Sequence, residues 1–205
     1  RPAGMMLRQA PSTSDTDGAR LVFDAFAMDI DWTFGLDIQK NIRDAELQDQ
    51  NGTVLRLLWP EAEIEQRGVF VEGEKAVSAD DVIKAGLRYD HVSAVANRRD
   101  EVNAGFSPQQ IWAMEGVSAG AGEEKTEDNV GGFTSWTHRL NDRYTLETLI
   151  SRSVRTADAT ERYMARTTAT TDWIGNPELE AEKHHQFDIS LHSKQDVTHL
   201  LITGV

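Results

Sequence analysis

The stretch Asp31-Trp32-Thr33-Phe34-Gly35-Leu36-Asp37-Ile38-Gln39 decides the fold class. Apolar side chains at every second position are separated by polar ones or by glycine. Because successive side chains of a β-strand point to opposite faces, this period of two predicts a strand with one apolar and one polar face. The preceding run, Leu21 to Ile30, is predicted to be its hairpin partner.

Further strands follow along the chain. An Asn51-Gly52 pair favours a tight turn, and the apolar run after it is expected to stop at Pro60. Residues 1–19 are rich in Pro, Gly, Ser and Asp and are expected to form a loop. The remaining predicted strands are 54–59, 68–77, 83–90, 132–139, 144–152 and 186–191.

The connections between these strands are of two kinds. Short turns at 78–81 and 141–143 alternate with long polar connections at 97–131 and 153–182. This asymmetry is typical of an all-β, antiparallel transmembrane β-barrel with short periplasmic turns and long outer loops, here with roughly 8–10 strands. A soluble β-sheet binding module stays open as an alternative, although its turns are usually spaced more evenly. An apolar band without a charge at its middle would favour the barrel.

Composition narrows the function. The formal net charge of −13 argues against a nucleic-acid partner, because phosphate binding needs clustered Lys and Arg. There is no cysteine, which excludes disulfides, thiolate metal sites and cysteine nucleophiles. The chain begins at Arg1 and stops inside the apolar run Leu200–Val205, so we expect it to be a fragment. No nucleophile elbow, phosphate loop or His-Glu-x-x-His motif occurs, so no enzyme is expected.

Two segments carry a family resemblance. One is Ser151-Arg152-Ser153-Val154-Arg155-Thr156-Ala157-Asp158-Ala159-Thr160-Glu161-Arg162-Tyr163, and the other is Gly175-Asn176-Pro177-Glu178-Leu179-Glu180-Ala181-Glu182-Lys183. In order and spacing they resemble the Ser-Arg and Gly-Asn-Pro-x-Leu-x-Pro-Glu motifs of TonB-dependent outer-membrane receptors. Ala157 and Ala181 stand where that family usually has Pro, and Asp188 where it often has Glu.

The resemblance implies that residues 1–205 are part of one receptor β-barrel domain, without the plug domain and the first barrel strands. It implies a receptor in the outer membrane of a Gram-negative bacterium. Such a receptor imports a metal ion or metal chelate and is energised by the TonB complex through segments outside this chain. Its other partner is outer-membrane lipid, and no tightly bound cofactor is implied.

Within that family the chain most resembles the copper receptors, through Met5-Met6, Trp59-Pro60 and Gly86-Leu87-Arg88-Tyr89-Asp90. Siderophore transport stays open as the alternative, and copper is the possible transported ligand. Met5 and Met6 are the candidate metal ligands, because thioethers suit Cu(I). Adjacent His184 and His185 would point to opposite faces of a regular strand and could not share one site.

Other side chains are interpreted structurally. Arg152, Arg155 and Arg162 with Asp158 and Glu161 are expected to pair and to hold a loop against the barrel wall. Asn176-Pro177 is interpreted as a loop anchor, because proline fixes its own φ and restricts the residue before it. The five tryptophans, Trp32, Trp59, Trp112, Trp136 and Trp173, are candidates for interfacial aromatic belts. Trp173 lies in an outer loop, so packing within that loop is the favoured interpretation for it.

Overall fold

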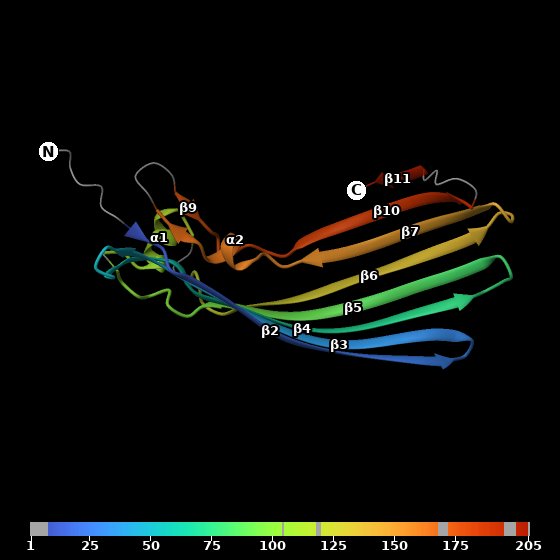
Figure 1. Ribbon diagram of the computed structural model, residues 1–205, viewed down its shortest axis with the longest axis horizontal. Helices are drawn as coiled ribbons and strands as arrows, with labels where there is room; N and C mark the ends of the chain where they lie inside the picture. The colour runs from blue at the N-terminus through green and yellow to red at the C-terminus, as the bar shows by residue number, and fades with distance from the viewer. Residues whose placement is uncertain (1–7, 104, 118–119, 168–171, 195–199, 205) are drawn as a thin grey trace.

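A computed structural model describes residues 8–103, 105–117, 120–167, 172–194 and, for the backbone, 200–204. They form a long, curved antiparallel sheet with two short helices and a small hairpin at one end (Figure 1). The elements are β1 (Arg8–Gln9), β2 (Ser12–Ala27), β3 (Ile30–Asp49), β4 (Val54–Ala76), β5 (Asp81–Ala96), α1 (Pro108–Met114), β6 (Lys125–Arg139), β7 (Tyr144–Arg155), α2 (Ala159–Tyr163), β8 (Ala165–Arg166), β9 (Trp173–Ile174), β10 (Glu182–Ser193) and β11 (Leu200–Gly204).

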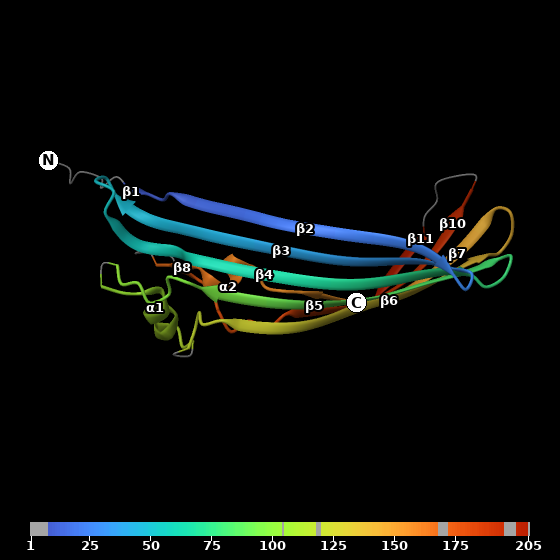
Figure 2. The same cartoon turned by 90° about the horizontal axis from the view of Figure 1, so that it is seen from below.

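The main sheet has nine strands in the order β1-β3-β4-β5-β6-β7-β10-β11, and β2 also pairs with β3. From β2 to β7 each strand pairs antiparallel with the next, and β7 pairs antiparallel with β10, as in the wall of an up-and-down barrel. Within the described residues the sheet does not close on itself. Figure 2 shows β2, β3 and β4 running side by side along most of the length of the molecule. The predicted fold class is confirmed.

The two ends of the sheet differ. At the turn end, short connections join β2 to β3, β4 to β5 and β6 to β7. The first of these has Met28 at φ 58° and Asp29 at φ 57°, the pair of left-handed residues that a tight hairpin turn requires. At the loop end lie the long connections 97–124 and 156–181 and the predicted turn at Asn51-Gly52. The alternation of short and long connections is confirmed, with both long connections shorter than predicted.

Two boundary predictions are wrong. β2 begins at Ser12, in a segment expected to be loop, because its backbone pairs with β3 from Ser12↔Ala45 onward. The strand that starts at Val54 does not stop at Pro60 but continues as β4 to Ala76. The pairing of β4 with β3 shifts register next to Pro60, and Glu61 adopts a φ of 49°. Such a bulge accommodates a proline that donates no hydrogen bond.

Alternation sorts the side chains onto two faces. Leu36 of β3 pairs with Leu21 of β2 and with Val69 of β4, and Val69 in turn pairs with Tyr89 of β5. Apolar residues therefore continue from strand to strand on one face of the sheet, which we call the apolar face. The residues that alternate with these along each strand point to the opposite face, which we call the polar face; Asp37 is one of them. On the apolar face no charged residue interrupts the positions within 19–25, 32–38, 69–73, 83–89, 130–136, 146–150 and 187–191. A seven-residue stretch is about 20 Å long.

The buried core lies at the loop end rather than within the sheet. There the two long connections pack against Ala62 of β4 and Ala94 and Ala96 of β5. These three alanines alternate in phase with the residues of the polar face, so the connections fold over that face. We call the described parts of 97–124 and 156–181 the loop cap.

Candidate functional site on the polar face and in the loop cap

An ion cluster crosses three strands on the polar face. Arg88 of β5 reaches across β4 and donates two hydrogen bonds of 2.8 Å to Asp37 of β3. It also donates to Asp90 at 2.8 and 2.5 Å, and the Gln66 amide donates to Asp90 at 2.9 Å. Gly68 lies between Asp37 and Asp90 in the register. A Cβ on Gly68 would come within 2.2 Å of Arg88 Nη2, so the glycine provides the space through which the arginine crosses.

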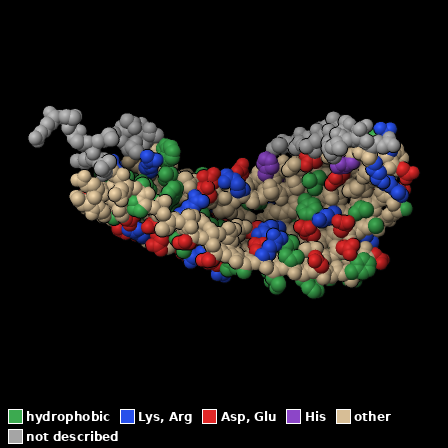
Figure 3. Space-filling model, viewed as in Figure 1, with side chains coloured by type: hydrophobic (Ala, Val, Ile, Leu, Met, Phe, Trp, Pro, Cys, Tyr) green, Lys and Arg blue, Asp and Glu red, His purple; other side chains and the backbone are tan. Residues whose placement is uncertain are grey.

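Beside this cluster the polar face is hollowed. Its lining includes Gly86, Gly131, Ser151 and Ser153, whose small side chains leave space above the sheet. The hollow has a volume of about 390 Å³ and is also lined by Arg20, Phe70, Glu72, Arg88 and Phe133. The Arg20 guanidinium lies 5.0 Å from the centre of the Phe70 ring, a cation–π distance. Figure 3 shows basic and acidic side chains intermixed along the body of the molecule. Aromatic faces, arginines and hydroxyls give this hollow the means to hold a polar or charged group.

Aromatic packing joins the two halves of the loop cap. Trp112 of α1 and Tyr163 of α2 are fully buried, with ring centroids 6.1 Å apart. Trp112 Nε1 donates to the carbonyl of Met164 at 3.2 Å. The small alanines of β4 and β5 allow these rings to approach the sheet closely. Trp112 therefore belongs to the cap core, and its prediction as an interfacial belt residue is wrong.

The predicted charge cluster holds the cap to the wall. Arg162 is fully buried and pairs with Glu127 of β6, and its Nε donates to the carbonyl of Ala157 at 3.2 Å. Arg155 of β7 donates to both oxygens of Glu161, at 2.9 and 3.1 Å, and its Nε donates to Glu182 at 3.0 Å. These hydrogen bonds raise the pKa of Arg155 above its usual value.

A capping box stabilises the first turn of helix α2. Asp158 accepts hydrogen bonds from the backbone of Thr160 and Glu161, and Glu161 accepts one from the backbone of Asp158, which together form a capping box. Burial raises the pKa of the neighbouring Tyr163 to about 12, so this phenol stays neutral at physiological pH. Within the predicted cluster only Arg155 and Glu161 pair with each other. The prediction is wrong for the other members: Arg162 pairs instead with Glu127 of β6, Asp158 caps α2, and Arg152 lies on the apolar face and contacts none of these carboxylates.

The Gly-Asn-Pro segment is a backbone anchor. The Gly175 N–H donates to the carbonyl of Met164 at 2.7 Å, and the Asn176 N–H donates to the carbonyl of Glu161 at 2.8 Å. A Cβ on Gly175 would come within 2.6 Å of the Arg162 carbonyl carbon. Glycine is thus required here for a close approach of two backbones. The two backbone hydrogen bonds hold the segment in place, in agreement with its interpretation as a loop anchor.

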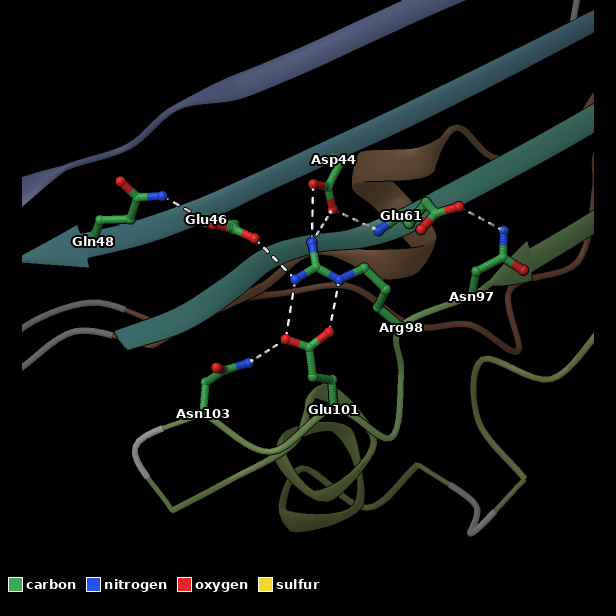
Figure 4. A network of polar contacts seen from close by, with 8 residues as sticks. All are labelled: Asp44, Glu46, Gln48, Glu61, Asn97, Arg98, Glu101 and Asn103. Atoms are coloured by element: carbon green, nitrogen blue, oxygen red, sulfur yellow. Dashed lines mark hydrogen bonds and ion pairs between the residues drawn. The ribbon is translucent and has the colours of Figure 1, made fainter. Parts of the chain in front are cut away.

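A second network lies at the opposite edge of the cap (Figure 4). Arg98 donates to Asp44 at 3.0 and 3.1 Å, to Glu46 at 2.9 Å, and to Glu101 at 2.8 and 3.0 Å. Asp44 also accepts from the backbone N–H of Glu61 at 3.1 Å, at the bulge of β4. These hydrogen bonds to Arg98 lower the pKa of Glu101, and those from Gln48 and Arg98 lower the pKa of Glu46. The network connects the bulged ends of β3 and β4 to the first residues of the cap.

The candidate metal ligands are separated from these features. Met5 and Met6 lie outside the described residues. His184 and His185 pair with successive residues of β7, Ser153 and Arg152, and so lie on opposite faces as expected. Among the described residues, no group of three or more His, Asp or Glu side chains is arranged to hold a metal ion. No described helix is long and apolar enough to cross a membrane.

Sequence signals for the cap were present but incomplete. Ser107 and Gln110 form a capping box at the start of α1, as Asp158 and Glu161 do for α2. Both follow the Ser/Asp-x-x-Gln/Glu pattern and could have predicted the two helices. The Asp37–Arg88 contact joins residues that are distant in sequence, and no local sequence pattern predicts it.

The chain matches solved structures along almost its whole length. The structure titled "Copper transporter OprC" has a TM-score of 0.72 and 19% identity, and the match covers 98% of this chain and 31% of that one. The ferric yersiniabactin uptake receptor FyuA from Yersinia pestis has a TM-score of 0.58 and 13% identity, with coverages of 98% and 29%. At these identities the likeness shows the fold, and the chain spans less than a third of either protein. No curated protein matches it.

The family assignment rests on a separate match. The family model described as "TonB dependent receptor-like, beta-barrel" matches residues 7–203, nearly the whole chain. This is a family of transport receptors rather than of enzymes, whose members are outer-membrane β-barrels of Gram-negative bacteria. The chain therefore belongs to the TonB-dependent receptor-like β-barrel family.

Proposed function

We propose that this chain forms part of the wall and outer loops of an outer-membrane receptor that imports a metal ion or metal chelate, energised through TonB. Copper is the first candidate substrate and a ferric siderophore the second. The TonB complex would act through segments outside this chain.

The observation that carries the proposal is the sorting of side chains onto two faces. Leu21, Phe23 and Leu87 are more than 60% exposed on the apolar face, and no charge interrupts the band that they belong to. An Arg or Lys at the centre of a lipid-facing band would cost about 2–4 kcal/mol, so an unbroken band is what a membrane requires. A soluble binding module has no such constraint on exposed positions.

The polar face and the loop cap support a route for polar cargo. Arg88, Asp37 and Asp90 satisfy one another, so this cluster is stable facing a water-filled or polar interior. The cap folds over the loop end of the same face, where a substrate from outside would first arrive. The hollow lined by Phe70, Arg88 and Phe133 lies further along the wall.

The membrane assignment can be tested on the full-length receptor that carries this segment. We expect it to fractionate with outer membranes, to need detergent for extraction, and to migrate differently on gels before and after boiling. A receptor that stays monomeric and folded in buffer without detergent would contradict the proposal and favour the soluble module.

Copper is favoured over a siderophore because the likeness to the copper transporter is the stronger of the two, in both TM-score and identity. The test is metal uptake by cells that lack the receptor, complemented with the wild type or with a Met5→Leu, Met6→Leu variant. We expect the wild type to restore copper uptake and the variant to reduce it. Restored uptake of a ferric chelate, but not of copper, would select the siderophore. Copper uptake unchanged in the variant would remove Met5 and Met6 from the site.

A further inference from the structure

The apolar face carries one group of basic side chains without acidic partners. Arg152 of β7 is in register with His185 of β10, and Lys183 lies two residues further toward the loop end of the same strand. All three are exposed. Among the described residues none of them forms an ion pair or a side-chain hydrogen bond.

The other basic residues at this border of the apolar face differ. Lys40 pairs with Glu63 at 2.6 Å, Arg67 with Glu65 at 2.5 Å, and His91 with Asp128 at 2.9 Å. Each of these basic residues lies on the apolar face, two residues nearer the loop end than the last apolar residue of its strand. Arg152 and His185 occupy the same kind of position in β7 and β10. Among the described basic side chains at this border, those without a carboxylate partner are therefore concentrated on β7 and β10.

A groove opens directly beside this group, on the same face. Gly132 pairs with Arg152 in the register, and Ile150 precedes Arg152 by two residues. Both line a hollow of about 440 Å³ that continues across the strands over Thr134, Leu87, Ala85 and Gly73. The groove exists because glycine and alanine stand where neighbouring positions carry Phe34, Leu36 or Val69. Its lining is almost entirely apolar, so water gains little by filling it.

We propose that Arg152, His185 and Lys183, with the groove over Gly132, Ala85 and Gly73, form a binding site for a phosphorylated lipid of the outer membrane. The lipid phosphate lies between the three basic side chains, and one acyl chain lies in the groove. A guanidinium presents paired donors that match phosphate oxygens, the lysine adds positive charge, and the imidazole adds an N–H donor. Basic side chains at the border of an apolar band are where lipid head groups are found.

The site rests on the proposed membrane location but not on the transported substrate. Charge and groove make separate contributions, which two variants can separate. Arg152→Gln, Lys183→Gln and His185→Gln together remove the charge. Ala85→Leu fills the groove with an apolar side chain that a bilayer tolerates.

The test is native mass spectrometry of the full-length receptor in detergent, delipidated and then titrated with one probe at a time. Dioleoyl phosphatidate carries phosphate and chains, dioleoylglycerol carries the chains alone, and inorganic phosphate carries neither chain. We expect wild-type receptor to prefer phosphatidate to dioleoylglycerol by about tenfold or more. The triple variant should lose that preference. Ala85→Leu should weaken phosphatidate binding without changing the response to inorganic phosphate.

The matched control is Lys40→Gln, which removes a basic residue of the same border that has a carboxylate partner. It should leave phosphatidate binding unchanged. Equal binding of phosphatidate and dioleoylglycerol by the wild type, or full phosphatidate binding by the triple variant, would overturn the proposal. Binding of inorganic phosphate as tight as that of phosphatidate would show a free-phosphate site and overturn the lipid assignment.

Two further readouts keep the test decisive. If the triple variant fails to fold, the salt dependence of phosphatidate binding to the wild type replaces it, because an ionic site weakens as salt rises. Binding that does not change with salt would overturn the proposal. If the receptor needs no detergent, the proposed function fails, whereas a detergent-dependent receptor without lipid preference contradicts this inference alone.

Discussion

The loop cap and the apolar face bury their large side chains in opposite ways. In the cap, Trp112 and Tyr163 are completely inaccessible to solvent, as in the core of a soluble domain. On the apolar face, Phe23 and Leu87 are each 64% exposed. The loop cap therefore buries its large apolar side chains against other parts of the chain, whereas those on the apolar face remain exposed within the described residues.

The difference shows which solvent each region is adapted to. Hydrophobic burial stabilises the cap only where water is the alternative. The apolar face gains the same stabilisation from hydrocarbon, while its backbone hydrogen bonds are satisfied by neighbouring strands. Substitutions that add or remove apolar surface should therefore have opposite consequences in the two regions.

The largest expected effect is on the cap. Trp112→Ala removes a fully buried ring and its hydrogen bond to Met164, which should cost about 3–5 kcal/mol of cap stability. Because proteolysis follows local opening, cleavage within 97–124 should accelerate more than a hundredfold while the barrel stays folded. Limited proteolysis of the full-length receptor measures this. Trp173→Ala is the control, since Trp173 is 55% exposed, and equal cleavage of the two variants would contradict the cap core.

The next effect tests the apolar face. Leu87→Arg places a charge in the band and should lower the free energy of unfolding in lipid vesicles by about 2–4 kcal/mol. At an exposed position of a soluble protein the same change would stay within about 0.5 kcal/mol. The control is Gln39→Arg on the polar face of β3, which should be tolerated. Urea unfolding followed by tryptophan fluorescence distinguishes the two outcomes, and equal stability of both variants would exclude a lipid-facing band.

A smaller effect concerns the junction of cap and wall. Gly175→Ala directs a methyl group at the backbone of Arg162 and Glu161, with nearest atoms at 2.6 to 2.8 Å. Backbone cannot rotate away as a side chain can, so the cost should be about 1–3 kcal/mol. Cleavage within 156–181 should rise accordingly. Gly120→Ala, whose Cβ would meet nothing closer than 3.7 Å, should behave like the wild type, and similar cleavage of both variants would contradict the close approach.

How far the sequence predicts this molecule also depends on the region. β3, β5 and the β6–β7 hairpin were predicted because alternation within one strand is local information. β2 extends back to Ser12 in spite of its composition, because a neighbouring strand supplies its hydrogen bonds. β4 passes Pro60 for the same reason, helped by a bulge. Pairing between strands thus overrides local turn preference at both errors.

The candidate site was less predictable than the sheet. The pairing of Arg155 with Glu161 was expected because the two residues are close in sequence, whereas Arg162 pairs with the distant Glu127, which no local pattern indicates. The crossing of Arg88 to Asp37 and the burial of Trp112 depend on contacts between distant segments, which only the assembled sheet creates. Met5 and Met6 stay predictions, since they lie outside the described residues.

The smallest expected effect is a pH dependence at the edge of the cap. Arg98 lowers the pKa of Glu101, so the folded pKa lies below the ordinary value of 4.5. A carboxyl group with a lowered folded pKa contributes stability that is fully present above its unfolded pKa and is lost as the pH falls through the folded one. Residues 97–103 should therefore open more readily below about pH 4.5, by no more than about 1 kcal/mol because Glu101 is 42% exposed. Hydrogen exchange of the described amides in this segment, corrected for intrinsic rates between pH 6 and 3.5, measures the opening.

The control is Glu101→Gln. This variant should start from a less protected state and change less with pH, because the neutral amide cannot titrate. A Glu101→Gln profile that falls as steeply as that of the wild type would contradict the role of Glu101 and assign the effect to Glu46, whose pKa is also lowered.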